Sequence, residues 1–154
     1  MGTKIIMRLT VALSGVAKLG LDTAPFIYFI ESNPAYLALM REVMRLIDSQ
    51  TLAAYCSVIT LTEVLTRPLQ MGDSALADQY RDILLNNRSL TMLPIDSATA
   101  ERAAKLRADY RLRTPDALQI AAALEYGCEA FLCNDSDMRR VADLRILLLD
   151  ELEI

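Results

Sequence analysis

The chain has 154 residues, of which 53% are hydrophobic, and this size suffices for one compact domain with a buried core. The formal net charge of −4 at pH 7 gives the whole molecule no attraction for nucleic acid. The chain contains no histidine, which excludes histidine-based catalytic triads, histidine general bases and most zinc sites. The three cysteines lack CxxC spacing and lie in apolar contexts, so we expect buried thiols in a reducing, cytoplasmic compartment.

The N-terminal segment allows two interpretations. Residues 9–17 are uncharged and follow two basic residues, a pattern that resembles a weak signal peptide. The same stretch is typical of a short helix closed by Gly15 that leads into the first strand. We favour the helix, and we treat residues 1–15 as an N-terminal extension of a single domain over residues 1–154. No apolar run reaches the length of a membrane span.

Strand-like and helix-like segments alternate along the chain. In chain order we predict a strand at 16–21, a helical turn at 25–30, a helix at 33–48 and a strand at 51–58. A helix at 60–68 stopped by a proline, a helix at 73–86, a strand at 90–93 and a helix at 96–109 follow. The last elements are a helix from 114 to Gly127, a strand at 130–133, a short helix at 136–141 and a strand at 145–149. This alternation predicts an α/β fold with a parallel sheet and helices on both faces.

Four carboxylates, Asp22, Glu63, Asp116 and Asp135, lie near the ends of these elements. Asp22 and Asp135 follow two of the strands, and Glu63 and Asp116 lie near the starts of two helices. In an open parallel sheet, strand carboxyl ends and the amino ends of the following helices meet at one edge. Packed carboxylates repel one another unless a cation is present or their pKa values shift. The pattern therefore predicts a site for a hard divalent cation at this edge.

Each acid also has a purely structural explanation. Glu63 with Thr60 matches a capping box, in which a glutamate bonds back to the first amide of its helix. Asp116 lies in the first turn of a helix, where the helix dipole favours a carboxylate. Asp135 could cap the short helix that follows it. Asp22 is the hardest to explain in this way, because it interrupts the apolar end of a strand.

Three arginines, Arg107, Arg111 and Arg113, form a basic cluster just before Asp116. One interpretation is an exposed helix end and loop. The other is a phosphate clamp at the rim of the acidic site, because arginine binds phosphate through two parallel hydrogen bonds.

Several motifs together resemble the PIN domain family, and in particular the ribonuclease toxins of VapBC-type toxin–antitoxin systems. The resemblance covers roughly residues 16–150, nearly the whole chain. The Thr114-Pro115-Asp116-Ala117 block is its most specific part, and the ordered spacing of the four acids adds to it. The motifs that carry it are Leu21-Asp22-Thr23, Ser57-x-x-Thr60-x-x-Glu63, Thr114-Pro115-Asp116-Ala117 with the residues that follow, and Cys133-Asn134-Asp135-x-Asp137.

The resemblance implies a three-layer α/β/α fold with a parallel central sheet of four or five strands, and a metal-dependent endoribonuclease that uses Mg²⁺ or Mn²⁺. By position, Asp22, Glu63, Asp116 and Asp135 take the family's four acidic places. The chain departs from the family pattern at residues 24–25, at Cys133, where threonine is common, and at Met138, where an aromatic residue is common. No departure removes an acid.

We expect Asp22 and Asp116 to bind the first ion directly, and Glu63 and Asp135 to act through water or hold a second ion. Asp135 rather than Asp137 is assigned to the fourth place, because it lies nearer the strand end. Auxiliary roles are expected for Asp137, Thr60 and Asn134, and substrate phosphates are expected to contact Arg113, Arg111 and Arg107.

The expected partners are an RNA substrate, a second copy of the chain in a homodimer, and a cognate antitoxin protein. The segment from Phe26 to Ile30, with Tyr36, Leu37 and Met40, is more apolar than one side of a small core needs. We expect the second copy or an antitoxin helix to cover this segment. Alternative functions are a housekeeping nuclease, a metal phosphatase for small phosphoesters and a non-catalytic protein-binding module.

Overall fold

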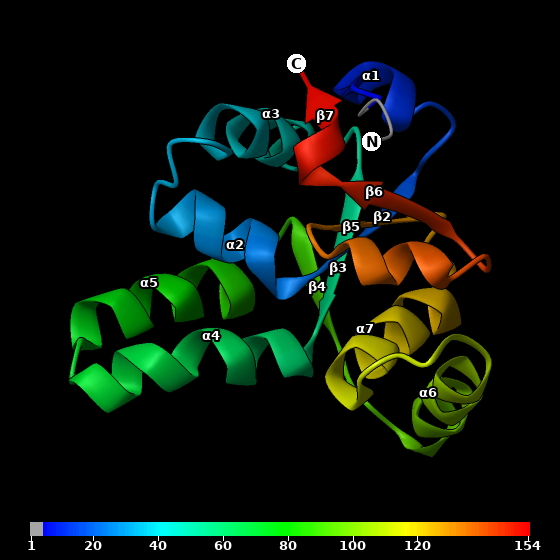
Figure 1. The fold of residues 1–154 in the computed structure, drawn as a ribbon. Helices are drawn as coiled ribbons and strands as arrows, with labels where there is room; N and C mark the ends of the chain where they lie inside the picture. The colour runs from blue at the N-terminus through cyan, green and yellow to red at the C-terminus, as the bar shows by residue number, and fades with distance from the viewer. Residues whose placement is uncertain (1–4) are drawn as a thin grey trace.

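The computed structural model describes residues 5–154, and its centre is a five-stranded parallel sheet (Figure 1). The strand order is β4-β3-β2-β5-β6, with β2 in the middle. This result confirms the predicted α/β fold with a parallel sheet. The strands are β2 (Lys18–Leu21), β3 (Ala53–Ser57), β4 (Leu90–Leu93), β5 (Ala130–Cys133) and β6 (Arg145–Leu148).

Helices cover both faces of the sheet (Figure 1). The helices are α1 (Leu9–Ala12), α2 (Thr23–Ile30), α3 (Leu37–Asp48), α4 (Val58–Met71), α5 (Ser74–Leu85), α6 (Ser97–Tyr110), α7 (Thr114–Glu125) and two short 3₁₀ helices, η1 (Ser136–Arg140) and η2 (Leu149–Glu151). Within residues 5–154, no helix is long and apolar enough to cross a membrane.

Alternating side chains of the strands supply two separate cores. Leu132 of β5 packs with residues of α1 to α5 on one face, whereas its neighbours Phe131 and Cys133 pack with α6, α7 and η1 on the other. This alternation is the period of two expected for a strand that is buried on both faces. The result is the expected arrangement of three layers.

A glycine in the central strand allows α7 to lie directly on the sheet. A Cβ atom placed on Gly20 of β2 would come within 2.9 Å of Phe131 Cδ2 and 3.0 Å of Ala123 Cβ. The 2.9 Å contact is shorter than real Cβ atoms show and the 3.0 Å contact is unusually tight, so any larger residue at this position would require Phe131 of β5 and Ala123 of α7 to shift. The amino end of α7 is thereby held beside the carboxyl end of β2.

The predicted start of α4 was wrong. The helix begins at Val58 rather than Thr60, and the hydroxyl oxygen of Ser57 caps it by accepting a hydrogen bond from the Ile59 amide at 3.2 Å. Glu63 therefore does not close a capping box with Thr60. Ser57, three residues before Thr60 and at the end of β3, caps the helix instead, because serine is as good a cap as threonine.

The predicted end of α4 was also wrong. Pro68 lies inside the helix, which continues to Met71 and ends at Gly72 with a φ of 67°. Proline removes one backbone donor, and Pro68 is tolerated at a buried position of the helix. The left-handed glycine ends the helix, with the Asp73 amide bonding back to the Pro68 carbonyl at 2.9 Å.

The helix predicted from residue 33 begins later, at Leu37. The Asn33 side chain accepts a hydrogen bond from the Ala35 amide at 2.9 Å, which stabilises a turn before the helix rather than its first turn. Phe26 and Met40 are fully buried where α2 and α3 pack on the core, and Tyr28 stacks on Tyr36. The side chains from Ile27 to Ile30 stay partly exposed while they pack against the core, so the covering of this segment by a second copy or an antitoxin helix stays a prediction.

The two ends of the described chain meet in a small sheet that the sequence pattern does not reveal. Strand β1 (Met7–Arg8) pairs in parallel with β7 (Leu152–Glu153). The expected short helix is α1, which precedes a left-handed Gly15 with a φ of 75°. Residues 1–4 of the expected N-terminal extension lie outside the described residues. The assignment of residues 1–154 to one domain remains a prediction.

Candidate active site

Asp22 and Asp116 are buried carboxylates at the carboxyl edge of the sheet. Asp22 follows β2 at the N-cap position of α2 and is only 8% exposed. Its backbone amide bonds to the Leu132 carbonyl of β5 at 2.9 Å, so the position of Asp22 is fixed by the sheet itself. Asp116 lies in the first turn of α7 and is equally buried. Burial of ionisable groups is unusual in a fold and is typical of functional sites.

The amide of Gln119 connects the acids across three elements. From α7, its Nε2 donates to Asp22 Oδ1 at 2.9 Å and to Glu63 Oε1 of α4 at 3.1 Å. Thr23 at the start of α2 donates its hydroxyl proton to the same Glu63 oxygen at 2.8 Å. Glu63 thus faces the site, in contact with α2 and α7.

Two buried hydroxyls hold the other end of the Gln119 amide. Ser57 Oγ and Thr60 Oγ1 donate to Gln119 Oε1 at 3.1 and 2.9 Å. Thr60, expected to be auxiliary to the site, is completely buried and touches the acids only through Gln119 and Thr23.

The four acids act on one another electrostatically. The pKa of Asp22 is raised from 3.8 to about 7, mainly by burial and to a smaller extent by the charges of Asp116, Glu63 and Asp135, against the opposing hydrogen bond from the Thr23 amide. In the structure, the charges of the other three predicted acids therefore all act on Asp22. Of the four, Asp116 alone forms an ion pair with an arginine or lysine in the described part of the chain.

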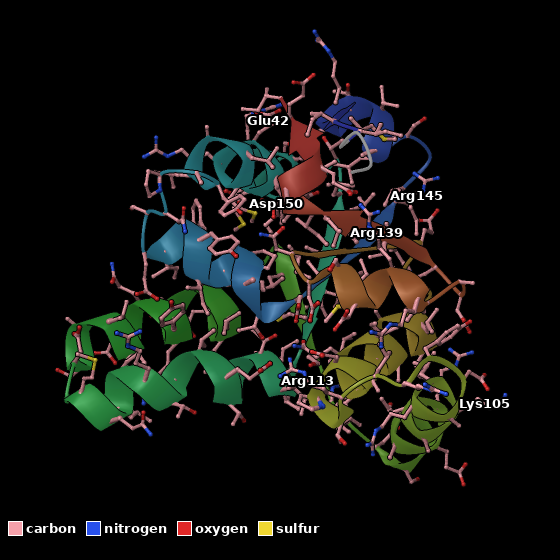
Figure 2. All side chains as sticks on the ribbon, viewed as in Figure 1. Glu42, Lys105, Arg113, Arg139, Arg145 and Asp150 are labelled. Carbon is pink, nitrogen blue, oxygen red and sulfur yellow. The ribbon has the colours of Figure 1, made fainter. Side chains whose placement is uncertain are left out.

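Only one arginine of the predicted basic cluster contacts the acids. Arg113 Nε lies 3.1 Å from Asp116 Oδ2, and its guanidinium also interacts with the charges of Asp135 and Glu63. Arg113 is labelled beside the start of α7 in Figure 2. Arg107 instead donates to the Leu112 carbonyl at 3.2 Å, and Arg111 ends α6 in the left-handed region with a φ of 56°. Arg107 and Arg111 thus help to form the turn between α6 and α7, and the phosphate clamp of all three arginines stays a prediction.

The segment after β5 separates three predicted residues. Asp135 Oδ1 accepts the Asp137 amide at 2.9 Å and so caps η1, while its charge still acts on Asp22. Asp137 is exposed, and its Oδ1 lies 3.1 Å from Arg140 Nη2. Asn134 bonds to the Tyr28 hydroxyl and accepts the Asp150 amide at 3.0 Å, so its amide connects β5 to α2 and η2.

Gln119 lies in the stretch that follows the Thr114-Pro115-Asp116-Ala117 motif, and the sequence pattern predicted no role for it. Its signal is the spacing of three from Asp116, which places both polar residues on one face of a helix otherwise filled by Ala117, Ile120 and Ala121. A polar residue on a packed helix face needs a buried partner. The partners, however, come from distant parts of the chain.

The donor set fits a hard divalent cation. All the available ligands are carboxylate and hydroxyl oxygens, which suit Mg²⁺ and Mn²⁺. In residues 5–154, no three acidic or cysteine side chains lie close enough to hold one ion jointly. Mg²⁺ usually binds through one or two carboxylates and keeps several waters, so Asp22 and Asp116 would suffice.

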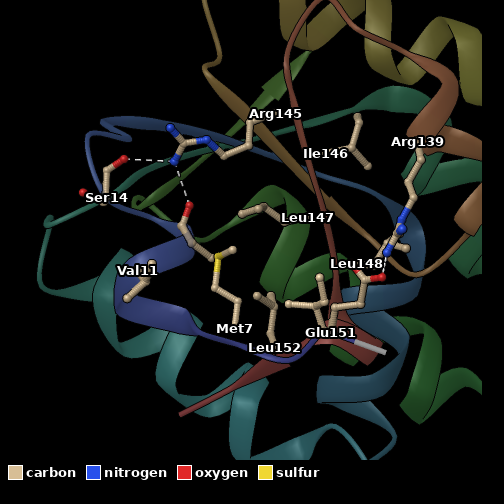
Figure 3. A pocket seen from close by; sticks show the side chains of 12 residues that line it. Met7, Val11, Ser14, Arg139, Arg145, Ile146, Leu147, Leu148, Glu151 and Leu152 are labelled. Atoms are coloured by element: carbon tan, nitrogen blue, oxygen red, sulfur yellow. Dashed lines mark hydrogen bonds and ion pairs between the residues drawn. The ribbon is translucent and has the colours of Figure 1, made fainter. Parts of the chain in front are cut away.

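One large hollow of the surface lies away from this site. It measures about 970 Å³ and lies against β6, α1 and β7, where Met7, Val11 and Leu152 line it (Figure 3). None of the four acids reaches it. A smaller groove of about 340 Å³ between α2, α4 and α5 includes Glu63 at its wall.

The raised pKa of Asp22 predicts a specific pH dependence of stability. In the absence of metal, the free energy of unfolding should fall by about 1–2 kcal/mol between pH 5.5 and 7 and level off above. The sign follows because the folded state retains a proton on Asp22 up to about pH 7, whereas the unfolded chain loses it near 3.8. Urea unfolding in excess chelator measures this effect.

The chain offers a clean background for this measurement. It has no histidine, and burial raises the pKa of Cys56 and Cys133 to about 12 and that of Cys128 to about 11. Asp22→Asn should remove the slope and be more stable than the parent at pH 8. A free energy of unfolding that does not change between pH 5.5 and 7 in the parent would contradict a raised pKa for Asp22. A pH dependence that survives in Asp22→Asn would do the same.

Several solved structures that resemble this fold are of toxins or toxin–antitoxin complexes. A VapBC complex from Salmonella typhimurium bound to DNA has a chain with a TM-score of 0.66 and 21% identity, covering 86% of this chain and 98% of its own. A chain of a toxin–antitoxin complex from Klebsiella pneumoniae has a TM-score of 0.65 and 18% identity, and the match covers 85% of this chain and 97% of that chain. VapC20 from Mycobacterium tuberculosis is described as a sarcin–ricin loop cleaving toxin. It has a TM-score of 0.65 and 16% identity, and the match covers 82% of this chain and 98% of that chain. At these identities the likeness shows the shared fold.

The sequence comparison extends beyond the fold. No curated protein sequence matches this chain significantly. The PIN domain pattern matches residues 20–144, which include all four acids and Gln119. With the parallel sheet and the structural neighbours, this match shows that the chain belongs to the PIN domain family.

Proposed function

We propose that this protein is a metal-dependent endoribonuclease and the toxin of a toxin–antitoxin pair. The observation that carries the proposal is the cluster of Asp22, Glu63, Asp116 and Asp135 at one sheet edge, with Asp22 buried and held by neutral groups. Such a cluster has an excess of negative charge that a divalent cation offsets. Nucleases of the PIN domain family typically use divalent metal ions.

Each residue of the cluster has a role in this proposal. Asp22 and Asp116 would hold the ion directly, and Glu63 and Asp135 would hold its waters or a second ion. A bound Mg²⁺ or Mn²⁺ supplies a Lewis acid, a more acidic water and charge that stabilises the transition state. The reaction needs no covalent nucleophile from the chain, in keeping with its lack of histidine.

Arg113 would bind the substrate phosphate next to the scissile bond. Its side chain is 74% exposed while its guanidinium contacts Asp116, so it can reach both the site and the solvent. It provides local positive charge on a chain with a net charge of −4. A polyanion is expected to approach the acids only when metal has reduced their charge.

The first prediction from this proposal concerns Asp116→Asn, which keeps the side-chain shape and removes one charge. Cleavage of RNA should fall by about 100-fold or more, because loss of even an indirect ligand contact costs roughly 10–100-fold in metalloenzymes. Cleavage of structured and unstructured RNAs with Mg²⁺, with Mn²⁺ and with chelator measures this effect. Asp48→Asn, at an exposed acid distant in sequence from the cluster, is the control and should cleave like the parent. Full activity in excess chelator, or undiminished cleavage by Asp116→Asn, would exclude the proposal.

The second prediction distinguishes Asp135 from Asp137. Asp135→Asn should lower cleavage more than Asp137→Asn, because the charge of Asp135 acts on Asp22 whereas Asp137 pairs with Arg140. Asparagine caps a helix about as well as aspartate, so both variants should melt like the parent. If Asp137→Asn is the more damaging change at equal thermal stability, the fourth acidic place belongs to Asp137.

We also propose a cognate antitoxin as partner, and a homodimer. The support is that chains with this fold were solved in toxin–antitoxin complexes. The groove between α2, α4 and α5 offers apolar side chains of Ile27, Val64 and Met71 next to Glu63. An amphipathic helix in this groove would bury its apolar face and cover one of the acids.

This proposal predicts a growth defect when the chain is expressed alone. Co-expression of the small protein encoded immediately upstream should relieve the defect and co-purify with the chain, because it would cover the acids. Light scattering of the purified chain should give twice the monomer mass. A monomer, together with normal growth in the absence of any partner, would contradict both partner assignments.

A further inference from the structure

The position of Gln119 makes it more than a buried hydrogen-bonding residue. Its side chain is 2% exposed, and it contacts residues from the ends of β2 and β3 and from the first turns of α2 and α4. One side chain of α7 thus connects the ends of two strands with α2 and α4.

The orientation of the Gln119 amide follows from counting protons. Ser57 and Thr60 each have one hydroxyl proton, and both protons point to Gln119 Oε1. The NH₂ group is consequently turned toward Asp22 and Glu63. The reverse orientation would place the carbonyl oxygen of Gln119 against two carboxylate oxygens, with only repulsion between them.

A neutral amide is the side chain that can hold two carboxylates without neutralising them. Its two N–H groups approach Asp22 Oδ1, Glu63 Oε1 and Thr23 Oγ1 at 2.9 to 3.1 Å. Lysine or arginine in this place would cancel negative charge that a divalent cation needs. An apolar side chain would leave both carboxylates without a donor.

We propose that Gln119 is a positioning residue that fixes Asp22 and Glu63 in the orientation in which they bind a divalent cation, with Ser57 and Thr60 fixing Gln119 in turn. This inference rests on the proposed metal-dependent function. Gln119 would not touch the substrate or the ion. Its effect is to restrict the rotation of two carboxylates before the ion arrives, which lowers the entropic cost of binding.

The experiment measures Mn²⁺ binding by calorimetry as well as RNA cleavage. Gln119→Met keeps the length and volume of the side chain and removes its donors and acceptor, so the Mn²⁺ dissociation constant should rise by roughly 10–100-fold. Cleavage should then need correspondingly more Mn²⁺, while the KM for RNA at saturating Mn²⁺ stays within about twofold of the parent. A merely structural role would lower the melting temperature and leave the dissociation constant unchanged at temperatures well below melting.

A matched pair at Thr60 keeps the proposal testable if Gln119→Met folds poorly. Thr60→Val retains the shape and loses the hydroxyl that holds Gln119 Oε1, so it should weaken Mn²⁺ binding several-fold. Thr60→Ser retains the hydroxyl and should bind Mn²⁺ like the parent. In the Gln119→Met background, Thr60→Val should add nothing further, because the two residues act through one path.

The outcomes separate this inference from the proposed function. A parent protein that neither binds Mn²⁺ nor cleaves RNA ends both. A parent that does both, with Gln119→Met or Thr60→Val binding Mn²⁺ at the parental dissociation constant, overturns the positioning role alone.

Discussion

The direct contact between α7 and β2 is the constraint on which the candidate site depends. Gly20 has no side chain, so Phe131 and Ala123 fill the space that any larger residue would need. The helix therefore approaches the middle strand of the sheet closely enough for Asp116 and Gln119 to lie beside the strand end. The strand order brings the other two acids to the same place. Strands β3 and β5 flank β2, and the segments that follow them carry Glu63 and Asp135.

The same packing creates an electrostatic cost. Burial and the neighbouring acids raise the pKa of Asp22, so the ionised site destabilises the fold. Neutral donors, namely Gln119 with Thr23, hold the carboxylates in place, and Arg113 pairs with Asp116 alone among the four. Carboxylates whose pKa is raised by burial and by neighbouring charges are typical of functional sites.

Local patterns predicted those elements whose signals are local. The strands at Leu90–Leu93 and Ala130–Cys133 were predicted to the residue, because each is a short apolar run with clear ends. The cap of α5 at Asp73 was correct for a similar reason. Errors arose where tertiary contacts outweigh local preference, as at Pro68 inside α4 and at the paired strands β1 and β7, which are too short to leave a pattern.

The sequence by itself determined the alternation of strands and helices, and hence a parallel sheet, and it placed four acids at the ends of these elements. It also excluded chemistry that requires histidine. Only the tertiary structure decided that Thr60 holds Gln119 rather than caps a helix, that Arg113 alone of its cluster contacts the acids, and that Gln119 links the acids. The reason is physical: a side chain's role depends on which partners reach it, and Gln119 and Asp22, which lie 2.9 Å apart in space, are 97 residues apart in the chain.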